Sequence, residues 1–140
     1  MFRRALLVLA TAGSLVALTA VPASAAADPT TCFTDTKTAT SLTICVDVTT
    51  NDRGIVMVGT APVGQATLIV HNAELYQCGA TSCPVAATDS GTAVTQWSGA
   101  YASFSFGHSY YGCAEVTITW GVVVQLSAYY PWICSGSRDN

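Results

Sequence analysis

Apolar and polar residues alternate along most of the chain beyond its first 27 residues. Between residues 42 and 49 every second side chain is apolar, which predicts a strand with one buried and one solvated face. The same alternation predicts further strands at residues 55–60, 66–77, 92–97, 101–106 and 115–126. Within residues 66–77 the alternation slips at His71 and Asn72, so a β-bulge is expected there.

Turn residues connect the expected strands. Residues 50–54 end in Gly54, which tolerates a positive φ, so the first two strands are expected to form a hairpin. A second hairpin is expected around residues 98–100. Residues 115–126 are expected to form the longest strand, because their large apolar side chains share one face: Ile118, Trp120, Val122, Val124 and Leu126. The polar tail at residues 135–140 is expected to fray.

Composition favours a protein built from strands. From residue 28 onward there are 17 Thr, 12 Val and 5 Ile against only 4 Leu, and β-branched residues favour strands over helices. No segment repeats its apolar residues with the period of an amphipathic helix. The expected fold is all-β, an antiparallel Ig-like β-sandwich of about seven strands that is stapled by disulfides, with a closed barrel as the alternative.

The first 27 residues have the three-part layout of a secretory signal peptide. Arg3 and Arg4 precede an apolar run over residues 5–20, and Pro22 and small residues follow. The run is shorter than the roughly 20 residues that a membrane-spanning helix needs. We therefore expect a cleaved signal peptide over residues 1–27 and a single β-sandwich domain over residues 28–140, secreted to the extracellular space and without a membrane partner.

Charge is sparse and slightly acidic. Charged residues make up 9% of the chain, and the formal net charge is -3. Without the leader, three basic residues remain against eight acidic ones, which gives a net charge of -5. A nucleic-acid partner is not expected, because binding to a phosphate backbone depends on a basic surface.

Six cysteines in an exported chain indicate three disulfides. Four residues that include a glycine separate Cys78 from Cys83, so this pair is expected to staple a tight loop. Cys45 lies on the polar side of its strand and can reach Cys32, which leaves Cys113 for Cys134. Six cysteines allow 15 pairings, and only the short pair is well specified. A zinc site is not expected, because no Cys-x2-Cys motif is present.

Two segments resemble a known family. Residues 76–84 (YQCGATSCP) and residues 99–106 (GAYASFSF) are similar to parts of the enediyne apoprotein (neocarzinostatin) group, within the small secreted Ig-like β-sandwich proteins of actinobacteria. The resemblance implies a secreted sandwich, with chromophore carriage, enzyme inhibition or an adaptor role as functions found in that class. It ends before Cys113, and the enediyne group has two bridges where this chain has cysteines for three.

Catalytic residues are few. The two histidines, His71 and His108, belong to no recognisable catalytic motif. The chain also contains no Asp-x-[Asp/Asn]-x-[Asp/Asn]-Gly calcium loop. His71 and Glu74 are three residues apart in an expected strand, which would place them on opposite faces. His108 is expected in a loop and Glu115 in solvent. The sequence therefore predicts no enzyme, no cofactor and no metal site.

Aromatic residues precede the last two cysteines. Tyr110 and Tyr111 lie just before Cys113, and three further rings lie just before Cys134: Tyr129, Tyr130 and Trp132. A bridge between these cysteines would bring the five rings together, and Tyr and Trp are enriched at interfaces because they combine an apolar body with a polar tip. The alternative is that Trp132 and one tyrosine of each pair belong to the core.

Two functions follow from this pattern. The first is a secreted, non-enzymatic protein-binding module, an adaptor or inhibitor whose partner is another secreted protein. The second is a small-ligand or carbohydrate-binding protein that uses an aromatic face or an apolar cleft, with a small aromatic molecule or a polysaccharide as ligand. The first is favoured here because the rings are expected near loops. A planar row of exposed rings would instead favour a sugar, and a deep apolar pocket a chromophore.

Overall fold

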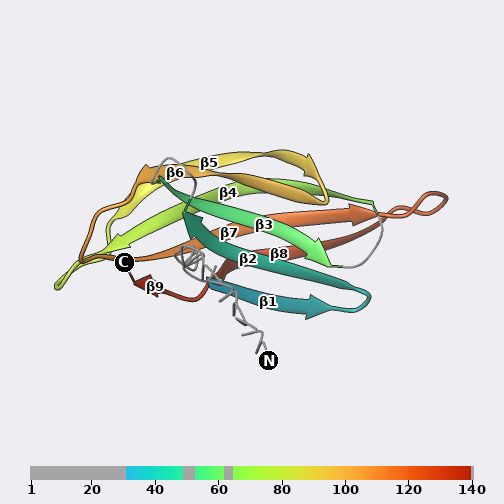
Figure 1. Ribbon diagram of the computed structural model, residues 1–140. Coiled ribbons are helices and arrows are strands. Elements are labelled where there is room, and N and C mark those ends of the chain that lie inside the picture. The colour runs from blue at the N-terminus through green and yellow to red at the C-terminus, as the bar shows by residue number, and fades with distance from the viewer. Residues whose placement is uncertain (1–30, 49–52, 62–64, 140) are drawn as a thin grey trace, which may run out of the picture.

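The protein is an antiparallel β-sandwich made of two sheets (Figure 1). The computed structural model describes residues 31–48, 53–61 and 65–139, and these residues form nine strands and no helix. The all-β fold predicted from the alternating pattern is confirmed. The alternating pattern predicted about seven strands; it did not mark β1 or β9, found only the end of β5, and merged the start of β8 with β7.

One sheet has four strands in the order β1-β2-β3-β6. Its strands are β1 (Thr31–Lys37), β2 (Thr40–Val48), β3 (Arg53–Ala61) and β6 (Gln96–Ser103). The hairpin between β2 and β3 is confirmed by pairing from Ser41 opposite Ala61 to Val48 opposite Gly54. Gly54 belongs to the ladder, so the expected turn does not fall on this glycine, and residues 49–52 lie outside the described residues.

The other sheet has five strands. They are β4 (Ala66–Cys78), β5 (Val85–Val94), β7 (Ser109–Trp120), β8 (Leu126–Cys134) and the short β9 (Arg138–Asp139). The order is β5-β4-β7-β8, and β9 pairs with β7 beyond the end of β8. The predicted leader, residues 1–27, lies outside the described residues.

The core lies between the two sheets and consists mainly of the inward-facing residues of β2, β3, β4 and β7, together with Trp97 and Ala100 of β6 and Tyr130 of β8. Every second side chain of β2, β3, β4 and β7 is fully buried, as the alternation requires. The largest fully buried apolar side chains are Leu42, Ile44, Val46, Val56, Val58, Leu68, Val70, Leu75, Val116 and Ile118. One face of the five-stranded sheet therefore packs against the other sheet, and its opposite face is directed outward.

The expected hairpin around residues 98–100 is wrong. β5 and β6 are separated by Thr95 alone, which has a φ of 66° and carries the chain from one sheet to the other. The Thr95 amide donates to the Ala66 carbonyl at 2.8 Å, and the Thr95 carbonyl accepts from Thr60 at 3.1 Å. A single residue bonded to both sheets turns this corner, which no glycine or proline signal marks.

The long strand expected at residues 115–126 is also wrong. β7 ends at Trp120, the chain turns at residues 121–125, and β8 returns beside β7 with Leu126 opposite Trp120. Gly121 has a φ of 107°, a conformation open to glycine and strained for other residues. The valines that looked like a continued strand form the tip of a hairpin, because this glycine ends the ladder.

The bulge predicted at His71 and Asn72 is confirmed by register shifts after Val70 on both sides of β4. The extra residue changes the alternation, so His71 and Glu74 lie on the same outer face of the sheet, where their partners are Thr117 and Asn72. The expectation that His71 and Glu74 face opposite sides is wrong for this reason.

All three proposed disulfides are present: Cys32–Cys45, Cys78–Cys83 and Cys113–Cys134. The first joins β1 to β2 and the third joins β7 to β8, each between directly paired residues. The second closes the loop between β4 and β5. Each bridge therefore staples neighbouring strands of one sheet.

The polar tail is more ordered than its composition suggests. Arg138 in β9 is almost fully buried and forms a salt bridge with Asp47 at 3.0 Å, while its guanidinium lies over the ring of Phe104. The expectation of a frayed tail is wrong, because this ion pair and the β9 pairing hold the tail against both sheets.

Replacing Gly121 with alanine is expected to destabilise the protein by about 1–3 kcal/mol, because a methyl group would strain the positive φ and clash with the Val124 carbonyl oxygen. Thermal unfolding of the oxidised variant measures this loss. Gly59→Ala is the matched control, because no atom lies near the place of its added methyl group. Equal melting temperatures for the two variants would contradict the prediction.

Candidate functional site

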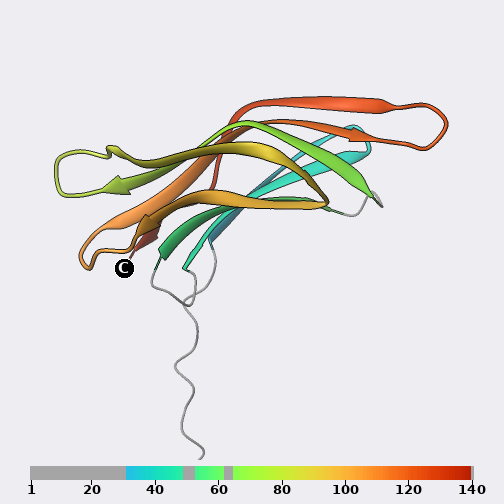
Figure 2. The same ribbon diagram turned by 90° about the horizontal axis from the view of Figure 1, so that it is seen from above.

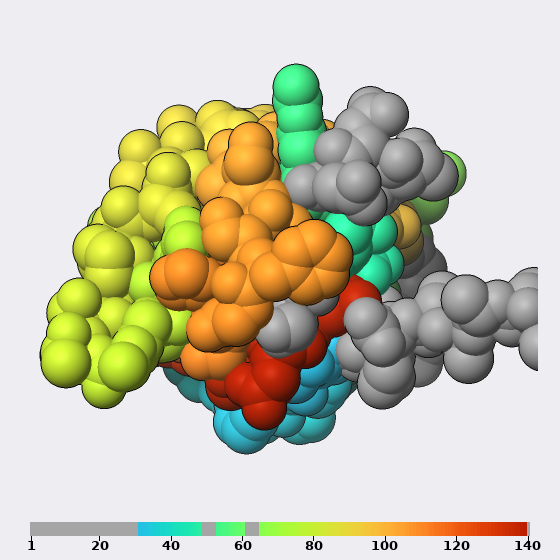
Figure 3. Space-filling model, turned by 60° about the vertical axis from the view of Figure 1, so that its left-hand side comes forward, coloured from blue at the N-terminus to red at the C-terminus, as the bar shows by residue number. Residues whose placement is uncertain are grey.

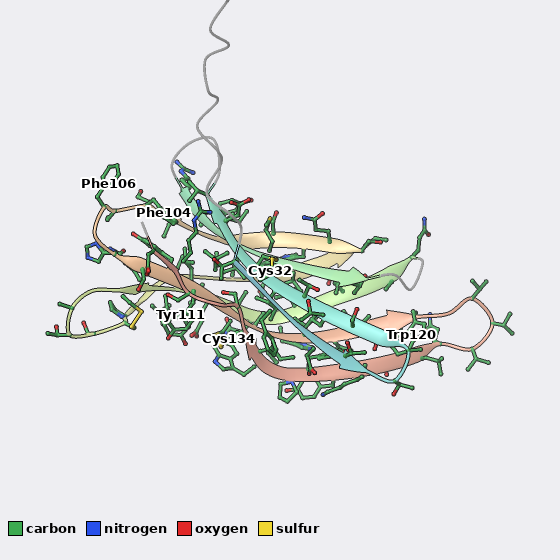
Figure 4. The ribbon with its side chains drawn as sticks, turned by 60° about the horizontal axis from the view of Figure 1, so that its bottom comes forward. Cys32, Phe104, Phe106, Tyr111, Trp120 and Cys134 are labelled. Carbon is green, nitrogen blue, oxygen red and sulfur yellow. A yellow bond between two sulfur atoms is a disulfide. The ribbon has the colours of Figure 1, made fainter. Side chains whose placement is uncertain are left out.

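The outer face of the five-stranded sheet gathers aromatic rings and carboxylates. We call it the aromatic face, and its residues are His71, Asn72, Glu74, Tyr76, Tyr111, Glu115, Thr117, Tyr129 and Trp132. The residues come from β4, β7 and β8, at positions that alternate with the buried core residues of the same strands. In Figure 4 the labelled Tyr111 and Cys134 lie on the same lower side of the ribbon.

Two of the five predicted binding residues are core residues. Tyr110 and Tyr130 are fully buried, so the prediction that they contact a partner is wrong. The Tyr110 hydroxyl accepts from the Ser105 amide at 2.7 Å, and its ring stacks on Phe104. The Tyr130 hydroxyl bonds with the Thr40 hydroxyl at 3.1 Å. Alternation along a strand sends one tyrosine of each pair inward and the other outward.

Trp132 lies in a strained turn of β8. Ile133 pairs with Ala114 and Tyr130 with Val116, so Pro131 and Trp132 together face Glu115 as a β-bulge. Trp132 has a φ of 40°, a conformation that is rare for a bulky residue. Its side chain is 40% exposed. Strained conformations of this kind cluster at functional sites, and bulges change the direction of side chains there.

Tyr129 is the second exposed ring on β8, and it is held in place on two sides. Its hydroxyl donates to Glu115, and its ring meets the edge of His71 with 6.3 Å between ring centroids. His71 in turn bonds with the Thr117 hydroxyl at 2.8 Å. The hydrogen bond to Glu115 raises the pKa of Tyr129 above its ordinary value. The ring is therefore pre-positioned while remaining half exposed.

A second cluster lies at the other end of the face. Tyr76 and Tyr111 are opposite each other in the ladder, and their rings stack with centroids 4.6 Å apart. The Tyr76 hydroxyl donates to Glu74, which also accepts from the Asn72 amide at 3.2 Å. The bond to Glu74 raises the pKa of Tyr76 to about 12, so the phenol keeps its proton even at alkaline pH, where an ordinary tyrosine ionises.

The two ring clusters are separated along β7. Tyr111 and Thr117, which lies opposite Tyr129, are six positions apart in the same strand, a distance of about 20 Å at the rise of a β-strand. The Cys113–Cys134 bridge and Trp132 lie between the clusters. An extended ligand would therefore meet rings at both ends and in the middle.

The prediction of the site was incomplete. It included Tyr111, Tyr129 and Trp132 and missed Tyr76, Glu74 and Asn72. The alternation of residues 72, 74 and 76 places these side chains on one face, which was a usable signal. Their position beside β7 depended on the β4–β7 pairing, which the sequence does not show.

Two other surfaces lack this combination of groups. On the outside of the four-stranded sheet, Cys45, Met57 and Gly59 help to line a shallow depression of about 180 Å³ that contains no aromatic ring. At one end of the sandwich the segment of residues near 100–110 lies between the loop near residue 80 and the C-terminal residues (Figure 3). Phe106 is exposed in that segment, and His108 lies near Gly79.

Within the described residues, no three metal-ligating side chains are close enough to hold a metal ion. No helix among them is long and apolar enough to cross a membrane. No protein-family model, no curated protein and no solved structure matches this chain.

Proposed function

We propose that the protein is a non-enzymatic carbohydrate-binding protein and that the aromatic face binds an uncharged polysaccharide. The observation that carries this proposal is the strained, half-exposed Trp132, which lies between two pre-positioned ring clusters. Aromatic faces pack against the apolar faces of sugar rings, while carboxylates and amides bond their hydroxyl groups. Glu74, Glu115 and Asn72 supply such groups beside the rings.

The positions of the outward-facing rings support a sugar over a protein partner. The sequence favoured a protein partner because the rings were expected near loops. Tyr76, Tyr111, Tyr129 and Trp132 instead lie within strands, on one face of a sheet. A row of rings across a sheet suits an extended chain of sugar rings. The depression around Met57 is too shallow and open to enclose an aromatic chromophore.

Charge indicates an uncharged ligand. The aromatic face contains two carboxylates, Glu74 and Glu115, and its one neighbouring cation within the described residues is Lys37, whose ammonium donates to the Tyr129 carbonyl at 2.8 Å. An anionic polymer would meet like charge there, which disfavours binding. Three disulfides are consistent with an extracellular protein, and we include export in the proposal because an extracellular protein meets polysaccharides directly.

Trp132→Ala is expected to lower the affinity for a bound polysaccharide at least tenfold, because ring stacking and buried apolar area are lost together. The measurement is co-sedimentation with insoluble cellulose, chitin and β-1,3-glucan, each in turn. Tyr101→Ala is the matched control, because Tyr101 is exposed to the same degree as Tyr129, 49% against 50%, but lies on the other sheet.

Tyr129→Phe is a finer test of the same site, because it keeps the ring and removes only the hydrogen bond to Glu115. A modest loss of binding is expected from this variant. Equal losses from Trp132→Ala and Tyr101→Ala would overturn the assignment of the face. Failure of the unmodified protein to bind any neutral polysaccharide, in a broad glycan screen, would overturn the proposed function.

A further inference from the structure

The tip of the β7–β8 hairpin is a projecting apolar surface that the proposed sugar site does not use. We call residues 121–125 (GVVVQ) the valine tip. Figures 1 and 2 show that it extends past the ends of the neighbouring strands. Val122 and Val123 are 102% and 95% exposed, and Val124 and Leu126 are also exposed. Soluble proteins rarely expose adjacent apolar side chains in this way unless they bind something.

The valine tip has a defined turn conformation before it binds anything. The ladder continues to the pair Trp120 and Leu126, so only residues 121–125 lie beyond it. Gly121 adopts a φ of 107° that sets the direction of the turn. Because the turn is short and its start is specified by the glycine, little conformational entropy would be lost when the tip binds.

Charge is absent from the part of the hairpin that is nearest the tip. Residues 116–134 contain no Asp, Glu, Lys or Arg. Trp120 lies at the base of the tip, partly buried against the core (Figure 4). Tryptophan is enriched where proteins meet the boundary between water and hydrocarbon, because its ring is apolar and its N–H is polar. Inserting the tip and the adjoining ends of β7 and β8 would therefore bring no charged side chain of residues 116–134 into an apolar medium.

We propose that the valine tip inserts into the hydrocarbon edge of a lipid layer and holds the protein at a membrane surface without crossing it. The exposure of Val122 and Val123 favours lipid over a protein partner. Both side chains are almost completely surrounded by solvent, and contact with a flat protein surface would leave part of each of them in water. Hydrocarbon surrounds an inserted tip completely, and the hydrophobic effect has no preferred direction.

The lipid headgroup need not be charged. Three basic residues against eight acidic ones from residue 28 onward give no general attraction to an anionic membrane. Insertion should therefore depend on the valines and not on surface charge. Binding to phosphatidylcholine vesicles is expected, and adding phosphatidylserine is not expected to strengthen it.

The test uses the oxidised protein purified after export, so that no leader contributes to binding. It is mixed with phosphatidylcholine vesicles, and the bound fraction is measured by co-sedimentation. The double variant Val122→Asn with Val123→Asn is expected to lower the partition coefficient at least tenfold, because two apolar side chains no longer leave water. Tryptophan fluorescence should shift to the blue on binding, and Trp120→Phe should remove most of that shift.

Phe106→Ser is the matched control. Phe106 is 92% exposed but lies in the loop at the opposite end of the sandwich (Figure 4). Its replacement should leave vesicle binding unchanged. Equal binding by the double variant, or no vesicle binding by the unmodified protein, would overturn the proposal. Valine-dependent self-association in sedimentation velocity without vesicle binding would also overturn it, and would identify a second copy as the occupant.

The valine tip and the aromatic face are separable. Trp132→Ala should weaken polysaccharide binding and leave vesicle binding intact, while the valine double variant should do the reverse. Each proposal therefore stands or fails by its own variant.

Discussion

Tyr110→Ala is expected to lower the free energy of unfolding by about 3–5 kcal/mol, the range for removing a large aromatic side chain from a packed core. Tyr110 is fully buried, and its ring stacks on Phe104 with centroids 4.0 Å apart. Its hydroxyl accepts from the amide of Ser105, so its loss also removes a hydrogen bond at the start of a loop. The cavity and the lost hydrogen bond both lower the free energy of unfolding.

Urea unfolding of the oxidised protein, followed by circular dichroism, measures this effect. Tyr110→Phe is the informative companion, because it keeps the ring and removes only the hydroxyl, and it is expected to cost about 1–2 kcal/mol. Tyr101→Ala on the surface should change the free energy of unfolding by less than about 0.5 kcal/mol. If Tyr110→Ala changed the free energy of unfolding as little as Tyr101→Ala, Tyr110 would not be part of the core.

Removing the Cys113–Cys134 bridge, by Cys113→Ala with Cys134→Ala, is expected to cost about 3 kcal/mol, since the bridge closes a loop with a sequence separation of 21 residues. The bridge also pins β8 to β7 two residues beyond Trp132. Its loss should free the bulge that holds the tryptophan. Polysaccharide affinity is therefore expected to fall together with stability.

The Cys78–Cys83 bridge is the matched control for that experiment. Its sequence separation is only 5 residues, so its removal is expected to cost less, about 2 kcal/mol in the same treatment. It closes the loop after β4, two residues beyond Tyr76 and away from Trp132, so polysaccharide affinity should fall less than after removal of the Cys113–Cys134 bridge. The reverse order of the two stability losses, measured by chemical unfolding at fixed pH, would contradict the loop-closure argument.

Local patterns accounted for much of the fold. The alternation of residues 42–49 and 66–77 identified β2 and β4, including the bulge at His71 and Asn72. The spacing of Cys78 and Cys83 identified their bridge, and the other two proposed bridges are also present. The strands, the bulge and the Cys78–Cys83 bridge depend on residues close together in the chain. The last bridge follows because only two cysteines remain once the other four are paired.

The turns between β5 and β6 and between β7 and β8 were harder to predict. Thr95 changes sheets through hydrogen bonds to Ala66 and Thr60, which lie 29 and 35 positions away. The valines after Gly121 continue the apolar alternation of β7, so the sequence resembled one long strand. Only the return of β8 beside β7 shows that the chain turns there.

The sequence by itself determined an all-β chain, the strands β2, β3 and β4, and five of the rings that lie on the aromatic face or in the core. The tertiary structure decided which rings face outward, because that depends on register: Tyr110 and Tyr130 point into the core while Tyr111 and Tyr129 point out. The tertiary structure also decided which residues lie together on the aromatic face. Glu74 and Glu115 come from strands far apart in the chain, and only the pairing of β4 with β7 places them on one face.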